Sequence, residues 1–240
     1  MLRTLLAPNP SPMTLDGTRT YVVGRSRVAI IDPGPADPSH LASLATAVGD
    51  GDAVILLTHQ HADHAAGAPE LARLLGAEIR SHAAGTLGAG DVIPTDAGEL
   101  RAVPTPGHTP DHVALHWPDA AAIFVGDLMM GGLDTALVAP AEGGDLRAYL
   151  DSLERLRTLG ARILYPAHGL EFTDPAGAFE RYRAHRIERL EQVRSALAAG
   201  IRDREALVDA VYGDAVPPAL RAWTRSTLEA YLDYLGVEVG

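Results

Sequence analysis

The chain has 240 residues with no cysteine, no lysine and a formal net charge of −11. The lack of cysteine excludes disulfides and thiolate metal ligands, and the acidic balance disfavours nonspecific binding to nucleic acid. No apolar run reaches the length of a membrane span and residues 1–9 lack the apolar stretch of a signal peptide, so we expect a soluble, cytoplasmic protein.

Short apolar segments in the first third of the chain predict strands that alternate with helices. The strands are bounded by polar and glycine-containing turns, and the second helix stops at a glycine. Alternation of this kind is typical of a layered α/β fold. We expect strands at residues 21–23, 28–31 and 53–57, a helix capped by Ser39 that runs to Val48, and a helix over residues 68–75.

A dense cluster of metal-binding side chains follows the strand that ends at Leu57. His59, His61, Asp63 and His64 fall within six residues. The spacing lets His59 and His61 approach one cation, while Asp63 and His64 turn toward a second position. Imidazole nitrogen and carboxylate oxygen suit zinc, iron or manganese. A polar loop with accidental histidines is the alternative, and the density of the cluster disfavours it.

Three further candidate ligands each follow or interrupt a short apolar segment. They are His108, Asp127 and His168, and a glycine beside each one permits a tight turn. We place none of His40, His82 and His116 at a metal, and expect His40 on a surface helix. Further strands are predicted at residues 100–103, 113–116, 122–125 and 162–165, with a helix capped by Asp145 whose leucines form an apolar stripe.

From Asp174 onward the sequence predicts only helices. Asp174 and Pro175 are a typical cap and first helical residue, and the segment is too apolar for disorder. We expect helices to about residue 199, over 203–211 and to Leu235, with a turn at 213–218. Residues 180–194 carry five arginines against three glutamates, which could seat phosphates, although a solvated helix face is the simpler interpretation.

The set of candidate ligands, taken in chain order, resembles the motifs of the metallo-β-lactamase superfamily. That resemblance implies a four-layer αββα sandwich. It implies that His59, His61 and His108 hold a first metal, that Asp63, His64 and His168 hold a second, and that Asp127 bridges them. Asp32 matches an aspartate that orients a ligand imidazole, with an ordinary turn residue as the alternative. His112, in the motif of residues 106–112, is expected to position or pack rather than to bind metal.

Two other regions are similar to one subgroup, that of beta-lactamase-like protein 2. Residues 9–21 resemble its amino-terminal signature, except that Arg19 stands where asparagine is more frequent, and the tail resembles its winged-helix-like extension. Glyoxalase II is a more distant relative. The resemblance therefore implies a catalytic domain over residues 1–178 and a small helical, winged-helix-like domain over 179–240.

The resemblance implies a hydrolase that uses two divalent metal ions, with zinc expected and iron or manganese as alternatives. A metal-bound hydroxide would attack a carbonyl or phosphoryl centre, with Asp63 and Asp127 taking part in catalysis. Members of the subgroup resemble thioesterases or endoribonucleases that cut single-stranded RNA. The absence of lysine disfavours β-lactam substrates. The acidic charge and 5% aromatic content place a small-molecule ester or thioester ahead of RNA.

Two other interpretations remain open at this point. The glycine-rich segment 129–144 could form a mobile rim with methionines facing an acyl group, or it could be an ordinary connection. The chain could also be a partner-binding scaffold with a vestigial site, although the intact ligand set weighs against that. The sequence carries no signal of oligomeric state.

Overall fold

The first of two five-stranded sheets has the strand order β1-β2-β3-β4-β5 in the computed structural model, which describes residues 1–131, 137–213, 216 and 220–240. The first three strands are antiparallel, and β3, β4 and β5 are parallel. Strands β1 and β5 were not predicted, because β5 has only three residues and β1 is only partly buried. The bounds are β1 (Leu2–Leu6), β2 (Arg19–Val23), β3 (Arg27–Ile31), β4 (Asp52–Leu56) and β5 (Glu78–Arg80).

The second sheet has the order β10-β9-β8-β7-β6. Strands β9 and β10 are parallel, whereas the other neighbours are antiparallel. Consequently β7, β9 and β10 run in the same direction, and their carboxyl ends lie at one edge of the sheet. Only β6 was not predicted. The bounds are β6 (Val92–Thr95), β7 (Gly98–Pro104), β8 (Val113–Trp117), β9 (Ala122–Gly126) and β10 (Ile163–Pro166).

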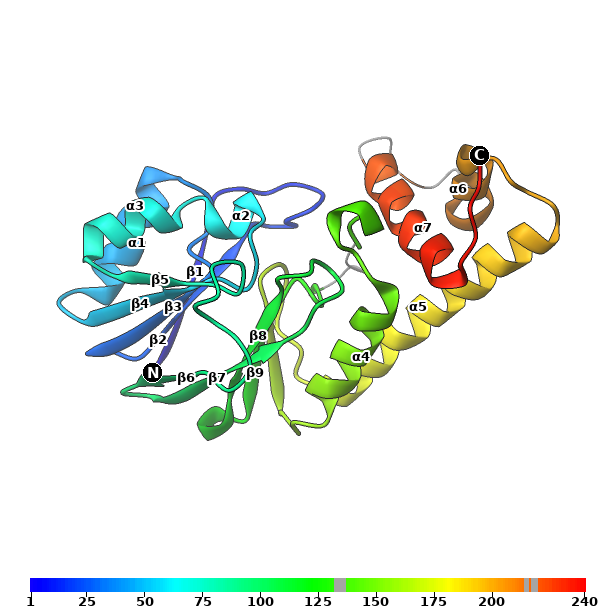
Figure 1. Ribbon diagram of the computed structural model, residues 1–240. Coiled ribbons are helices and arrows are strands. Elements are labelled where there is room, and N and C mark those ends of the chain that lie inside the picture. Colours follow the sequence, from blue (N-terminus) through cyan, green and yellow to red (C-terminus); the bar gives the residue numbers. More distant parts are fainter. Residues whose placement is uncertain (132–136, 214–215, 217–219) are drawn as a thin grey trace.

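The two sheets lie between two layers of helices (Figure 1), and three hydrophobic clusters fill the spaces between these four layers. Alternate residues of the strands face each other between the sheets, where the rings of Tyr21 and Phe124 lie 5.0 Å apart. Helices α1 (Pro38–Val48) and α3 (Ala68–Leu75) cover the outer face of the first sheet. Helices α4 (Leu146–Arg157) and α5 (Pro175–Ala198) cover the second. The predicted αββα sandwich is confirmed.

Aspartate caps set the beginnings of four helices. Asp145 and Asp174 cap α4 and α5 as predicted, and Asp203 caps α6 (Arg204–Tyr212). The prediction for α1 was wrong: the helix begins two residues before its expected start. Asp37 is its cap, since this carboxylate accepts the backbone N–H of His40 at 2.8 Å and Pro38 occupies the first helical position.

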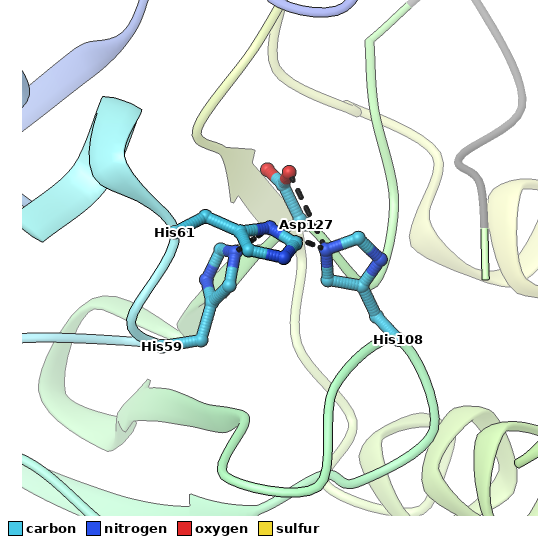
Figure 2. Close-up of side chains that lie close together, drawn as sticks. All are labelled: His59, His61, His108 and Asp127. Carbon is cyan, nitrogen blue, oxygen red and sulfur yellow. Dashed lines mark hydrogen bonds and ion pairs between the residues drawn. The ribbon is translucent and has the colours of Figure 1, made fainter. Parts of the chain in front are cut away.

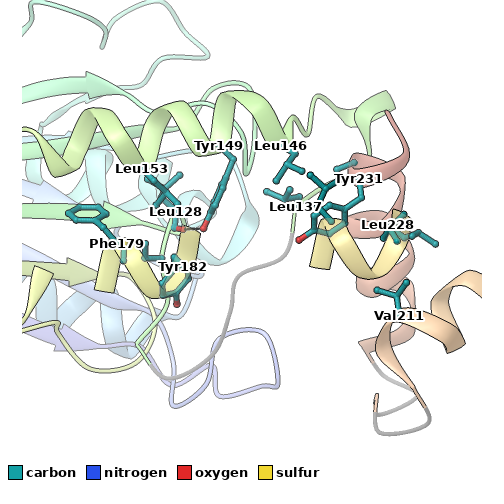
Figure 3. Close-up of a cluster of buried hydrophobic side chains, with 14 of the residues drawn as sticks. Leu128, Leu137, Leu146, Tyr149, Leu153, Phe179, Tyr182, Val211, Leu228 and Tyr231 are labelled. Carbon is teal, nitrogen blue, oxygen red and sulfur yellow. Dashed lines mark hydrogen bonds between the residues drawn. The ribbon is translucent and has the colours of Figure 1, made fainter. Parts of the chain in front are cut away.

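The tail continues the core of the second sheet. Helices α5, α6 and α7 (Arg221–Leu235) bury residues in the same cluster as α4 (Figure 3). Residue 178, where the sequence suggested a domain boundary, lies in the first turn of α5, so this one helix belongs to both parts. Arg186 is buried between Tyr149 and Tyr231 and does not lie on a solvated face. The predicted turn at residues 213–218 lies largely outside the described residues.

Short helices complete the described fold. A single helical turn, α2 (Ala62–Ala65), follows β4, and the 3-10 turns η1 (Pro118–Ala120) and η2 (Pro140–Glu142) lie in connections. No helix in the described part of the chain is both long and apolar enough to cross a membrane.

Candidate metal centre

All seven predicted ligands converge at one end of the sandwich. His59 and His61 lie in the loop after β4, and Asp63 and His64 lie on α2. The other three come from the carboxyl ends of strands in the second sheet: His108 follows β7, Asp127 follows β9 and His168 follows β10. Because β7, β9 and β10 run in the same direction, these side chains reach the same edge.

One group of donors consists of His59, His61, His108 and Asp127 (Figure 2). Nδ1 of His61 lies 2.9 Å from Nε2 of His59 and 3.3 Å from Nε2 of His108. Oδ2 of Asp127 lies 3.8 Å from Nε2 of His108. Three imidazoles and one carboxylate oxygen therefore face a common point.

A second group consists of Asp63, His64, Asp127 and His168. Nε2 of His168 lies 3.3 Å from Nε2 of His64 and 3.1 Å from Oδ2 of Asp63. Oδ1 of Asp127 lies 3.4 Å from Nε2 of His64 and 3.3 Å from Nε2 of His168. The two oxygens of Asp127 thus face different groups.

The spacing of these donors fits metal ions. Tetrahedral zinc with Zn–N bonds of about 2.0–2.1 Å separates its nitrogen ligands by roughly 3.3 Å. Imidazole nitrogens that lie this close together without a shared cation gain little stabilisation. Oδ1 of Asp127 is also buried without a hydrogen bond. The donor set and this unsatisfied oxygen both fit a pair of divalent cations.

Asp32 lies behind the loop and contacts His64. Its Oδ2 accepts Nδ1–H of His64 at 2.9 Å, which leaves Nε2 facing the second group. The same carboxylate accepts the backbone N–H of Thr58 at 2.8 Å and the Thr58 hydroxyl at 2.7 Å. The Thr58 oxygen can then accept Nδ1–H of His59 at 3.1 Å. Asp32 thereby orients imidazoles of both groups.

The amino-terminal loop fixes His168 from the other side. Nδ1–H of His168 donates to the carbonyl of Gly17 at 3.2 Å, so its Nε2 faces the second group. Arg19 pairs with Asp16 through two hydrogen bonds of 2.8 and 2.7 Å. The residue that departs from the subgroup pattern therefore forms a local ion pair beside the segment that holds His168.

His112 is buried and contacts the backbone that carries Asp127. Its Nε2 accepts the N–H of Asp127 at 3.2 Å, and its Nδ1 lies 2.8 Å from the Thr105 hydroxyl. Gly126 has φ +50°, and a Cβ there would lie 2.6 Å from Nε2 of His112. A glycine is needed at this position so that the strand can turn and present Asp127.

Burial and neighbouring carboxylates act in opposite directions on the imidazole pKa values. Burial lowers the pKa of His59 well below its usual range, and burial with the charge of His108 lowers the pKa of His112 to about 3. Burial also disfavours charged His64, but Asp127 and Asp32 outweigh it and hold the pKa of His64 well above its usual range. In the absence of metal, protons occupy part of this site.

His40, His82 and His116 lie outside both groups. His82 lies in a turn, and His116 lies in β8, where a strand was predicted. His40 lies on α1, an outer helix as expected, but its side chain is buried, with 4% of its surface exposed. It lies on the face of α1 that packs against the first sheet, where its Nε2 is 3.1 Å from the Thr20 hydroxyl.

A family model decides where this chain belongs. The model described as "Metallo-beta-lactamase superfamily" matches residues 13–87 and 82–168, which include all seven candidate ligands. The chain belongs to the metallo-beta-lactamase superfamily. This membership agrees with the resemblance that the motifs carry.

Two relatives of this superfamily member are similar over most of its length. An atrochrysone carboxyl ACP thioesterase of Aspergillus chevalieri is 36% identical over 204 residues, which are 80% of this chain and 64% of that protein. A beta-lactamase-like protein 2 homolog of Drosophila melanogaster is 34% identical over 214 residues, 79% of this chain and 71% of that protein. The chain thus spans just under two thirds of the fungal thioesterase.

Solved structures share the fold of this superfamily member. The metallo-beta-lactamase family protein TTHA1429 of Thermus thermophilus aligns with a TM-score of 0.82 at 23% identity, over 98% of this chain and 93% of that one. TTHA1623, solved in a di-iron-bound form, aligns with a TM-score of 0.55 at 26% identity, over 71% of this chain and 94% of that one.

A pocket of about 250 Å³ lies beside the metal-binding side chains. His61, Asp63, His108 and Asp127 line one side of it. Ala62 and Met130, from the segment after β9, also line the pocket, and three residues that were not predicted to line the site complete it: Met13 and Thr14 from the amino-terminal loop and Trp223 from α7. The predicted methionine rim is thus represented by Met130, whereas residues 132–136 of that segment lie outside the described residues.

Proposed function

We propose that this chain is a dinuclear metal-dependent hydrolase that acts on an ester or thioester. The observation that carries the proposal is the pair of donor groups joined through Asp127. A vestigial site in a partner-binding scaffold would not be expected to keep seven donors with two sets of orienting contacts, so we do not favour that alternative.

The proposed ligands are those that the sequence indicated. His59, His61 and His108 would hold one cation, Asp63, His64 and His168 the other, and Asp127 would contribute one oxygen to each. Nitrogen and oxygen donors without thiolate suit zinc and also iron. Zinc is the proposed metal. Iron is the alternative, because TTHA1623 is described in a di-iron-bound form.

Two divalent cations would supply Lewis-acid polarisation of the substrate carbonyl and a water whose pKa is lowered toward neutrality. The side chains provide the remaining parts. Asp63 lines the pocket, and its side chain is 31% exposed, so its carboxylate can contact both water and substrate. We propose that Asp63 takes a proton from the attacking water and returns it to the departing thiolate. The carbonyl carbon gains a C–O bond and loses its C–S bond, which gives an acid and a thiol.

The pocket favours an acyl substrate over RNA. Methionine and tryptophan side chains line the same pocket as the donors, and none of the described residues that line it is an arginine. RNA phosphates bind at basic or hydrogen-bonding surfaces. The Aspergillus chevalieri relative is named a thioesterase, which supports the same choice.

The proposal is tested by assaying acyl thioesters and a labelled single-stranded RNA side by side with zinc-loaded protein. We expect thioester hydrolysis without RNA cleavage, and loss of about 10²-fold or more in the Asp63→Ala variant, as for removal of a proton-transfer group. Asp50→Ala is the matched control, because Asp50 is exposed in the turn before β4. RNA cleavage that disappears in Asp63→Ala, without thioester turnover, would contradict the proposal.

A further inference from the structure

Trp223 is placed where a substrate would contact it. The chain has two tryptophans. Trp117 is 7% exposed within the inter-sheet core, whereas Trp223 is 36% exposed and lines the pocket above the donors. Met13 and Met130 line the same pocket. Met13 is partly exposed, whereas Met130 is buried, with 4% of its surface exposed. Apolar side chains that line a pocket beside a few polar groups are typical of ligand sites.

Helix α7 is held firmly against the rest of the molecule. Leu228 and Tyr231 are buried in the core shared with α4 and α5 (Figure 3). The backbone N–H of Leu137 donates to the Thr227 hydroxyl at 3.2 Å, and the Ser226 hydroxyl donates to the Leu137 carbonyl at 3.2 Å. The helix that carries Trp223 is therefore fixed relative to the segment that follows Asp127.

Helix α5 holds the beginning of that segment. The backbone N–H of Met130 donates to the Tyr182 hydroxyl at 2.8 Å, and this hydroxyl donates in turn to the Met130 carbonyl. The tail thus contributes Trp223 to the pocket directly and positions Met130 within it. The positions of Trp223 and Met130 in the pocket therefore both depend on helices that follow residue 174.

We propose that Trp223, Met13 and Met130 form an acyl-binding surface that makes the enzyme selective for thioesters of bulky apolar acyl groups. This inference rests on the proposed function and names the part of the substrate that the tail recognises. A volume of about 250 Å³ is smaller than the roughly 300–1,000 Å³ of sites that enclose whole drug-sized ligands. The pocket therefore takes the acyl group, and the thiol carrier lies outside.

The charge of the pocket supports an uncharged group. The charged carboxylates that line it, Asp63 and Asp127, belong to the donor groups, and the described lining residues include no arginine. An anionic group beside Trp223 would find no arginine to pair with among the described residues that line the pocket. An alkyl chain or ring gains from contact with indole and thioether surfaces without needing a charged partner.

The experiment compares octanoyl and acetyl thioesters of N-acetylcysteamine on zinc-loaded wild type, Trp223→Ala and Trp223→Phe. We expect Trp223→Ala to lower kcat/KM about tenfold or more for the octanoyl thioester and less than about twofold for the acetyl thioester, because apolar contacts discriminate by this order. Trp223→Phe should retain most of the octanoyl preference. An unchanged ratio between the two thioesters in Trp223→Ala would overturn the proposal.

A fluorescence measurement tests the surface without turnover. Trp117→Phe leaves Trp223 as the single tryptophan, and Trp223→Phe leaves Trp117. Octanoate, the acid product, should shift the emission of Trp117→Phe to shorter wavelength and leave that of Trp223→Phe unchanged.

If wild type hydrolyses neither thioester, the proposed function fails while the emission shift still tests the apolar surface. No shift with octanoate would overturn the surface itself. RNA cleavage that falls in Trp223→Ala would also overturn it, because Trp223 would then stack on bases.

Discussion

At the scale of single residues, Asp32 connects the two donor groups. One buried carboxylate accepts three hydrogen bonds, from the Thr58 N–H, the Thr58 hydroxyl and His64. It does so from a left-handed backbone conformation, with φ 50°, which aspartate and asparagine tolerate better than most residues. The position therefore needs both the turn and the carboxylate.

Replacement of Asp32 tests this role. Asp32→Ala should weaken zinc binding by about 10–100-fold, since residues that orient metal ligands have effects of this size. Competition with a chromophoric chelator measures the affinity, and Asp50→Ala serves as the control. Zinc binding by Asp32→Ala at wild-type strength would show that His64 is oriented without it.

The ligands could be predicted from the sequence, whereas the pocket walls could not. His59 to His64 are neighbours in the chain, and the other ligands each follow an apolar strand, so local pattern was sufficient. Trp223 carries no such local signal, because only tertiary packing brings α7 to a site built by residues 59–168. The burial of His40 was missed for a related reason: the face that a helix buries depends on its partner sheet.

At the scale of elements, the Tyr182 hydroxyl joins α5 to the segment after β9. Tyr182 is fully buried, and it pairs with both backbone groups of Met130. A hydroxyl that donates and accepts at one residue fixes that residue more firmly than apolar packing would.

Tyr182→Phe should lower the free energy of unfolding by about 1–3 kcal/mol, because it leaves two buried backbone groups of Met130 without this partner. Denaturant titration measures the change. Tyr165→Phe is the control, because Tyr165 is partly exposed in β10 and takes no part in the hydrogen bonds between Tyr182 and Met130. Equal stability of the two variants would mean that Met130 finds other partners.

Some strands and helices could be predicted from the sequence, and others could not. The long inner strands and the capped helices α4 to α6 were predictable, because their apolar periodicity and aspartate caps are local signals. Strands β1, β5 and β6 lie at or near sheet edges, and β5 and β6 have only three and four residues. Such strands form because they pair with a neighbouring strand, and their own sequences show little of the hydrophobic alternation that predicts a strand.

At the scale of the whole molecule, metal binding should be coupled to stability. The seven donors lie on α2 and in segments that follow strands of both sheets, so cations held there would join the two halves of the sandwich. Ligand that binds only the folded state stabilises it by about 4 kcal/mol when present at 1,000 times its Kd. For a chain of this size that corresponds to roughly 8–16 °C in Tm.

Thermal unfolding with excess chelator and with excess zinc measures this coupling. We expect a higher Tm with zinc for wild type and a much smaller difference for Asp127→Ala, which removes the shared ligand. The same Tm in chelator and in zinc would contradict a metal centre that joins the sheets.

The most direct measurement is metal content per chain together with thioester hydrolysis, made on wild type and Asp127→Ala. The proposed centre predicts two metal ions per wild-type chain, hydrolysis that is lost with chelator and restored by metal, and a fall of both metal content and hydrolysis in Asp127→Ala. Retention of two metal ions and full hydrolysis by Asp127→Ala would contradict it.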